Sequence, residues 1–166
     1  MTAPKTRVVV AGIGNLMRGD DGVGPVVATR LAPALPPSVK TLVGLGDPLE
    51  LIEVWDGAEL AIVVDAVVSG SPPGTIHVLD ADAPLPSMFR RLSTHLFSVA
   101  QVIELGRVME RIADRVVVIG IEAASMDQDK VGLTPEIDAA AREVVAIVRA
   151  MVEEVLKHDV GAPGNA

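Results

Sequence analysis

The chain of 166 residues contains no cysteine and no tyrosine, and only 2% of its residues are aromatic. Without cysteine there is no disulfide framework, no thiolate nucleophile and no cysteine-based zinc site, so any bound metal must be held by His, Asp or Glu. Basic residues are also few: the chain has 14 Lys and Arg residues against 22 Asp and Glu residues, which gives a net charge of −8. Nucleic-acid binding needs a cationic face and often aromatic stacking platforms. These absences predict a protein or small-ligand partner and exclude nucleic acid.

Long hydrophobic runs are missing too, although 49% of the residues are hydrophobic. The apolar runs have the length of strands and are interrupted by Gly, Asp or Arg, whereas a membrane span needs about 20 apolar residues. The opening residues MTAPKTR lead straight into an apolar strand pattern, without the hydrophobic segment of a signal peptide. We therefore expect a cytoplasmic protein with no membrane partner. Residues 1–160 are expected to form one domain and residues 161–166 a disordered tail.

Apolar β-branched runs alternate with helical patterns along the chain, which is typical of a sheet covered by helices on both faces. The pattern predicts strands at residues 8–13, 40–43, 61–65, 75–79 and 115–121. It predicts helices at residues 21–35, 49–54 and 135–157, and another that is capped by Ser93 or Thr94 and runs to about residue 112. Thr134 is expected to be the N-cap of the last helix. Because no helix separates the third and fourth strands, the fourth strand is expected to run antiparallel, at or near an edge.

A glycine-rich stretch, GIGNLMRGDDGVG at residues 12–24, follows the first predicted strand. It does not match a dinucleotide-binding loop, because Met17 stands at the third glycine position and acids follow where a pyrophosphate would lie. The Gly-Lys-Ser/Thr of a P-loop is absent as well. The adjacent Asp20 and Asp21 favour a cation, while the alternative is that both only cap the first helix.

Further ionisable residues are expected at the carboxyl ends of the strands, where open α/β sheets bind ligands: Asp47, Asp65, His95 and Glu122. Asp65 interrupts the apolar stretch AIVVDAVV, and a carboxylate there needs a positive or hydrogen-bonding partner, which capping of a loop would also provide. His95 is expected at a helix start, where the dipole favours the neutral, metal-ligating imidazole. His77 and His158 are weaker candidates. Two carboxylates and one imidazole suit nickel or zinc.

Six segments in this order and spacing resemble the endopeptidases that mature NiFe hydrogenases: GIGNLMRGDDGVG, VVDAVVSG, PGTI, STHLFS, IGIE and GLTPEI. The resemblance covers the chain from Val8 to about Val155. It implies a three-layer α/β/α sandwich of the phosphorylase/hydrolase-like kind, with a twisted, mostly parallel five-stranded sheet and one antiparallel strand. It also implies a cytoplasmic endopeptidase that removes the C-terminal extension of a hydrogenase large-subunit precursor after nickel insertion.

The resemblance assigns three residues to metal contact and catalysis, namely Asp21, Asp65 and His95. Because the family is understood to lack a catalytic metal of its own, the nickel arrives with the precursor, and zinc or cadmium could substitute for it in crystals. This assignment predicts that Asp21→Asn loses processing, whereas Asp20→Asn retains most of it. One departure from the family pattern is Val43, which takes a position that is often acidic, with Asp47 following four residues later.

Two other functions remain open for this sequence. A nonenzymatic nickel sensor or chaperone would use the same three ligands, but it would not shorten a nickel-loaded precursor. A nucleosidase or methyltransferase on a related sheet is the other alternative, and the missing glycine pattern and the acidic loop count against it. For a protease without an evident serine or cysteine nucleophile, attack by water is the simplest mechanism, with Asp21 or Asp65 as the base.

Overall fold

The computed structural model describes residues 5–158, apart from residues 46, 83–97 and 128. The described residues form the strands β1 (Val8–Ile13), β2 (Val39–Leu45), β3 (Leu60–Val67), β4 (Ile76–Asp80) and β5 (Arg115–Glu122). The helices are α1 (Val23–Leu31), α2 (Glu50–Trp55), α4 (Val99–Val108) and α5 (Pro135–Lys157). Two short 3-10 turns flank α1, at Gly19–Gly22 and Ala32–Ala34.

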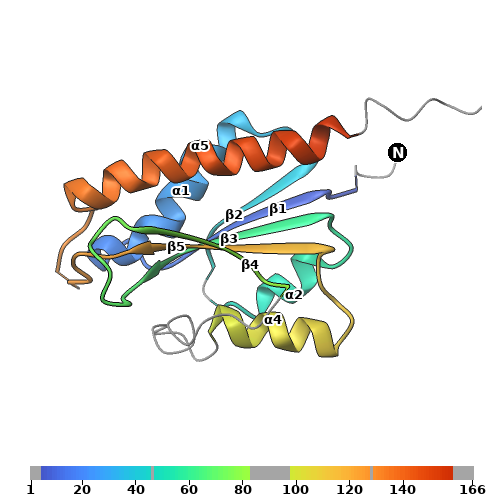
Figure 1. Ribbon diagram of the computed structural model, residues 1–166, viewed down its shortest axis with the longest axis horizontal. Coiled ribbons are helices and arrows are strands. Elements are labelled where there is room, and N and C mark those ends of the chain that lie inside the picture. Colours follow the sequence, from blue (N-terminus) through green and yellow to red (C-terminus); the bar gives the residue numbers. More distant parts are fainter. Residues whose placement is uncertain (1–4, 46, 83–97, 128, 159–166) are drawn as a thin grey trace, which may run out of the picture.

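The strands form a five-stranded sheet in the order β2-β1-β3-β5-β4 (Figure 1). β1 pairs in parallel with β2 and β3, and β3 pairs in parallel with β5. β4 lies at the edge and runs antiparallel to β5, as the sequence predicts. Helices α1 and α5 cover one face of the sheet, and α2 and α4 cover the other (Figure 1). The predicted three-layer α/β/α fold is therefore confirmed.

The central strands are apolar at consecutive positions because both of their faces are covered. In β3, Val63 packs in the cluster on the α2 and α4 side, whereas Val64 packs in the cluster on the α1 and α5 side. Helix α5 begins at Pro135 and buries Val144 and Val148 on its inner face. The core thus lies in two layers, one on each side of the sheet.

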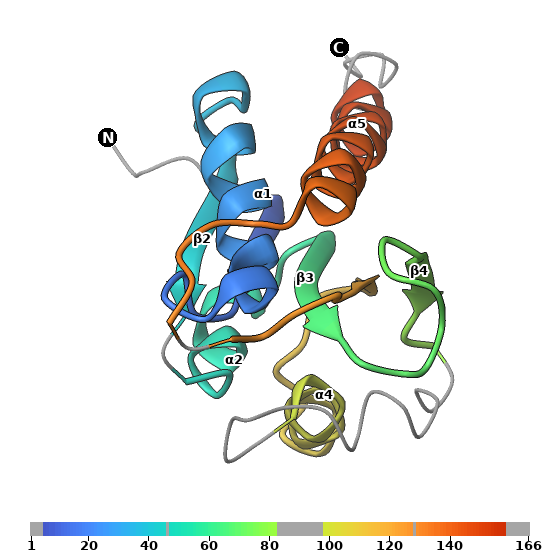
Figure 2. The same cartoon turned by 90° about the vertical axis from the view of Figure 1, so that its left-hand side faces the viewer.

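The chain changes direction across the sheet at β1. It passes from β1 to β2 through α1, and it returns from β2 through α2 on the other face to reach β3, on the far side of β1. Ligands of open α/β sheets bind beyond the carboxyl ends of strands at such a switch point. Figure 2 looks onto this edge, where the arrowhead of β3 faces the viewer. Asp21 follows β1 and Asp65 lies on β3, so both candidate acids lie near the switch point.

Two glycines of the GIGNLMRGDDGVG stretch let α1 approach the sheet closely. A Cβ atom on Gly24 would overlap the backbone carbonyl oxygens of Ile13 and Val64, and one on Gly12 would overlap the carbonyl oxygen of Gly24. These backbone atoms belong to β1, β3 and the first turn of α1, so they cannot move aside without disrupting the packing. The glycines therefore serve close packing of a helix on two strands.

Some predicted boundaries near this edge are wrong. The helix expected from residue 21 begins at Val23, after the 3-10 turn, and β3 continues two residues beyond Asp65. The helix expected to end near residue 112 ends at Val108 as α4, and the N-cap of α4 is Ser98, in a capping box with Gln101. Expectations for residues 83–97, which include His95, and for the tail at 161–166 lie outside the described residues.

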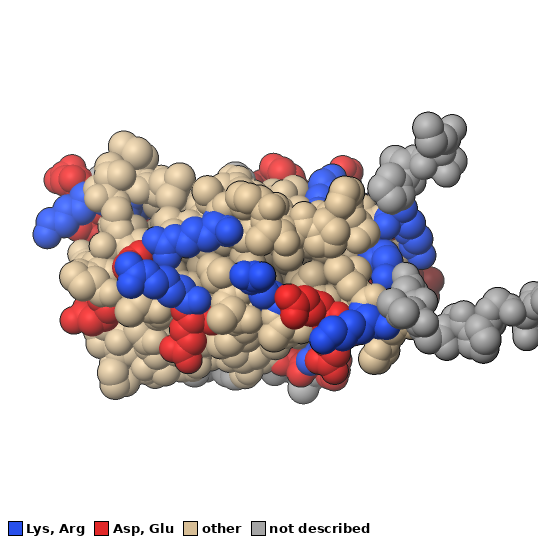
Figure 3. Space-filling model, turned by 90° about the horizontal axis from the view of Figure 1, so that it is seen from above, with Lys and Arg blue, Asp and Glu red and all other residues tan. Residues whose placement is uncertain are grey.

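The outer face of α5 mixes charges of both signs. Asp138 forms ion pairs with Arg142 on the same helix and with Arg30 on α1. Lys and Arg are interspersed with Asp and Glu over this side of the molecule (Figure 3). The described residues therefore form no extended basic surface on this face. Within the described ranges, every helix is either too short or too polar to cross a membrane.

Candidate active site

Asp21 is a buried carboxylate in the turn between β1 and α1. Its Oδ2 atom accepts a hydrogen bond of 3.0 Å from the backbone N–H of Asn15, so the loop folds back on itself around this side chain. Gly14 makes this fold possible, because its φ of 139° is a conformation that favours glycine and a Cβ there would overlap the carbonyl oxygen of Asp21. Asp21 is thus held in a preformed loop at the edge of the sheet.

Asp65 lies near Asp21, on the neighbouring strand β3. Its side chain is partly buried and points to the α2 and α4 side, on the same face of β3 as Val63 and Val67. Burial raises the pKa of Asp65 well above its ordinary value, and the negative charge of Asp21 raises it further, against a lowering by a backbone hydrogen bond from Ala66. The two carboxylates are therefore close enough to repel each other, and a divalent cation between them would remove this repulsion.

Asp65→Asn is expected to raise the melting temperature at neutral pH, with a gain that disappears near pH 4. The pKa of Asp65 is raised in the fold. At a pH below its unfolded value of about 4 the carboxyl group is neutral in both states, and as the pH rises toward the folded value only the unfolded chain ionises, so stability falls. Asparagine stays neutral throughout. Thermal melts between about pH 4 and 8 check this.

The control for this experiment is Asp80→Asn. Arg115 lowers the pKa of Asp80 through a side-chain hydrogen bond, so the wild-type carboxylate stabilises the fold above its unfolded pKa. Its removal should cost a little stability at neutral pH, which is the opposite sign. An effect of Asp65→Asn that does not vary with pH would contradict the electrostatic cause.

The third predicted ligand, His95, lies outside the described residues. Among the residues that the structure describes, no group of three His, Cys, Asp or Glu side chains is arranged to hold a metal ion. The structure therefore brings together Asp21 and Asp65, and the three-residue site stays a prediction.

Asp20, next to Asp21, has a separate role. Its Oδ1 accepts the backbone N–H of Thr134 at 2.8 Å, and its Oδ2 accepts those of Ala124 at 3.0 Å and Ser125 at 2.8 Å. The Thr134 hydroxyl lies 3.0 Å from both oxygens and donates to them. Asp20 is fully buried. Asp20 therefore links the loop after β1 to the segment before α5 through hydrogen bonds. These two segments lie side by side in Figure 2.

The interpretation that the two aspartates cap the first helix is wrong. The residue at the N-cap of α1 is Gly22, and no side chain accepts a capping hydrogen bond there. Thr134 does occupy the predicted N-cap position of α5, but its side chain makes no capping bond to that helix. Nothing in the sequence pointed from Asp20 to Thr134, because the contact joins residues 114 positions apart.

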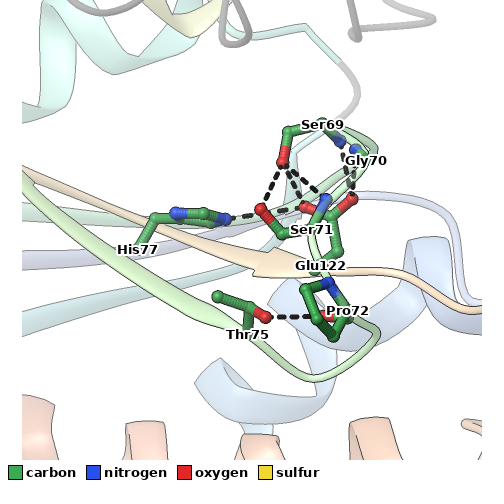
Figure 4. Close-up of polar contacts among 7 residues, drawn as sticks. All are labelled: Ser69, Gly70, Ser71, Pro72, Thr75, His77 and Glu122. Atoms are coloured by element: carbon green, nitrogen blue, oxygen red, sulfur yellow. Dashed lines mark hydrogen bonds and ion pairs between the residues drawn. The ribbon is translucent and has the colours of Figure 1, made fainter.

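Glu122, another acid at this edge, binds the segment that leaves β3 (Figure 4). Its Oε1 accepts the N–H groups of Ser69 at 2.6 Å and Gly70 at 3.1 Å, and its Oε2 accepts the Ser69 hydroxyl at 2.7 Å. His77 Nε2 lies 3.5 Å from the same Oε2. Asp47 is exposed and accepts the N–H of Leu49 at 3.0 Å. Glu122 thus holds the segment after β3 in place, and Asp47 holds the turn before α2.

The sequence is similar to those of known proteins. A profile of the hydrogenase maturation protease family matches residues 27–151. The chain belongs to this family. The hydrogenase expression/formation protein HupD from Rhodobacter capsulatus is 34% identical over 158 residues, which cover 91% of this chain and 75% of HupD.

Solved structures of hydrogenase maturation proteases have the same fold. The hydrogenase maturating endopeptidase HybD from E. coli superposes with a TM-score of 0.79 at 27% identity, covering 89% of this chain and 93% of HybD. The maturation protease HycI from Thermococcus kodakarensis gives a TM-score of 0.68 at 27% identity, covering 92% of this chain and 94% of HycI. The family resemblance inferred from the six sequence segments is confirmed.

Proposed function

We propose that this hydrogenase maturation protease is an endopeptidase that removes the C-terminal extension of a NiFe hydrogenase large-subunit precursor after nickel has been inserted. The observation that carries the proposal is the Asp21 and Asp65 pair, which lies at the switch point of a fold shared with maturating endopeptidases. The proposal places this activity in the cytoplasm, on the basis of the family resemblance.

Nickel enters this proposal as part of the substrate. Two carboxylates that repel each other suit a divalent cation, and the imidazole of His95 would complete an oxygen and nitrogen ligand set of the kind that nickel or zinc accepts. Asp21, Asp65 and His95 would hold the nickel-bearing region of the precursor and so position the bond to be cleaved. Zinc or cadmium soaked into crystals should occupy the same three residues.

The chain's own contribution to hydrolysis is a base for the attacking water. Asp21 and Asp65 are the carboxylates available beside the metal-bearing region of the substrate, and either can accept a proton from water. The described loop around Asp21 is preformed through the Asn15 hydrogen bond, so this carboxylate needs little reorganisation.

A processing assay tests the proposal. The purified protein is incubated with the large-subunit precursor, loaded with nickel or free of it, and the products are measured by mass spectrometry. The expected result is a shortened precursor only in the nickel-loaded sample. Binding of the loaded precursor without any change in its length would instead support a nonenzymatic sensor or chaperone.

His95→Ala is expected to abolish processing of the nickel-loaded precursor, because it removes the imidazole ligand. The matched control is His158→Ala, at the exposed C-terminal end of α5, which should process normally. Melting temperatures of both variants check that each is folded. Equal cleavage rates for the two variants would show that His95 has no special role.

A further inference from the structure

A cleft of about 490 Å³ lies between the loop after β1 and the end of β2. The side chains on its walls include Asn15, Leu16, Pro25, Val43 and Leu45. Among the residues that the structure describes, none that lines the cleft is charged, although the chain carries a net charge of −8. Pockets of this size accommodate small ligands or a few side chains of a bound chain. These described residues offer a charged group no side chain of opposite charge, whereas an apolar group would gain by leaving water.

The loop after β1 connects the cleft to Asp21. Asn15 lines the cleft, and its backbone N–H donates to the Oδ2 atom of Asp21. An extended polypeptide advances only about 3.3 Å per residue. A substrate chain with its cleaved bond at Asp21 therefore places residues next to that bond over the cleft.

The walls of the cleft also present apolar surface to solvent. Leu16 is 47% exposed and Val43 is 48% exposed. Val43 belongs to β2, which is an edge strand of the described sheet. The pairing of β2 with β1 shifts by one residue at Gly44, directly after Val43. An extended chain can approach such an edge along its backbone while its side chains enter an adjacent pocket.

We propose that this cleft binds an uncharged, apolar segment of the precursor polypeptide adjacent to the cleaved bond. Leu16 and Val43 form the apolar surface that selects such a segment. The inference rests on the proposed endopeptidase function, and it assigns a role to Val43, the position at which this sequence departs from the family pattern.

Substitution of Val43 by asparagine tests the cleft, with Val78→Asn as a matched control. Val78 is 44% exposed and lies on β4, the edge strand at the opposite side of the sheet. For Val43→Asn, the KM for nickel-loaded precursor is expected to rise about tenfold with kcat within about twofold of wild type, since ground-state and transition-state binding fall together. Val78→Asn should leave both constants unchanged. Melting temperatures check that both variants are folded.

A second pair of variants tests the cleft without altering β2. Leu16→Asn should raise the KM in the same way, and Leu105→Asn, at a position 38% exposed on α4, should not. If wild type cleaves the precursor and the KM is unchanged in both cleft variants, the cleft is not a substrate site and the endopeptidase function stands. An equal rise in the controls would also overturn the inference. If wild type does not shorten the loaded precursor, the proposed function fails, and this inference fails with it.

Discussion

Replacing Asp20 by asparagine is expected to lower the melting temperature by roughly 10 °C, at about 2–4 °C for each kcal/mol lost in a domain of this size. Both oxygens of the fully buried Asp20 accept backbone N–H groups, one from Thr134 and the other from Ala124 and Ser125. An asparagine side chain has a single acceptor oxygen, so its NH2 group must face an N–H donor. Losing charge-assisted bonds and leaving buried donors unsatisfied costs about 3 kcal/mol.

The control for Asp20 is Asp127→Asn, in the same segment before α5. Asp127 is exposed, and its Oδ1 accepts the N–H of Asp129, so its substitution should change the melting temperature by about 1 °C or less. Thr134→Val removes the hydroxyl that donates to Asp20, and its effect should not add to that of Asp20→Asn. Equal melting temperatures for Asp20→Asn and Asp127→Asn would contradict the role of Asp20 in linking the loop after β1 to the segment before α5.

Asp21→Asn is expected to lose processing by at least about a hundredfold, which is the scale of removing a general base, while the fold stays intact. An amide is also a poorer ligand than a carboxylate for a divalent cation. The asparagine oxygen can still accept the N–H of Asn15, and the loss of one charge relieves the repulsion from Asp65. The melting temperature should therefore equal or exceed that of wild type. Cleavage of nickel-loaded precursor and a thermal melt on the same sample check both parts.

Asp47→Asn is the control for this substitution, because Asp47 is an exposed acid after β2 at the same edge of the sheet. It should cleave at the wild-type rate. Cleavage by Asp21→Asn at a similar rate would show that the proposed mechanism is wrong. The expectation from sequence that Asp20→Asn keeps most of its processing now holds only at temperatures where this variant stays folded.

The sequence predicted the layers and the strand directions of this protein well. Apolar β-branched runs predicted every strand of the described sheet, because a covered strand needs apolar side chains on both faces. The absence of a helix between β3 and β4 predicted the antiparallel edge strand, since a parallel crossover needs a longer connection. Boundaries near the site were less predictable. A 3-10 turn at Gly19–Gly22 precedes α1, and the close approach of the helix at Gly24 to the backbones of Ile13 and Val64 involves residues far apart in the sequence.

The sequence by itself determined the chemistry available to the site and the family to which the chain belongs. The lack of cysteine left only oxygen and nitrogen ligands, and the order of six short segments indicated a hydrogenase maturation protease. The family resemblance already separated Asp21 from Asp20, but only the tertiary structure showed what Asp20 binds. Asp20 and Asp21 are chemically identical, but folding surrounds Asp20 with donors from residues more than 100 positions away and brings Asp21 close to the charge of Asp65. A carboxylate's role is set by the donors and charges around it, and those come from distant parts of the chain.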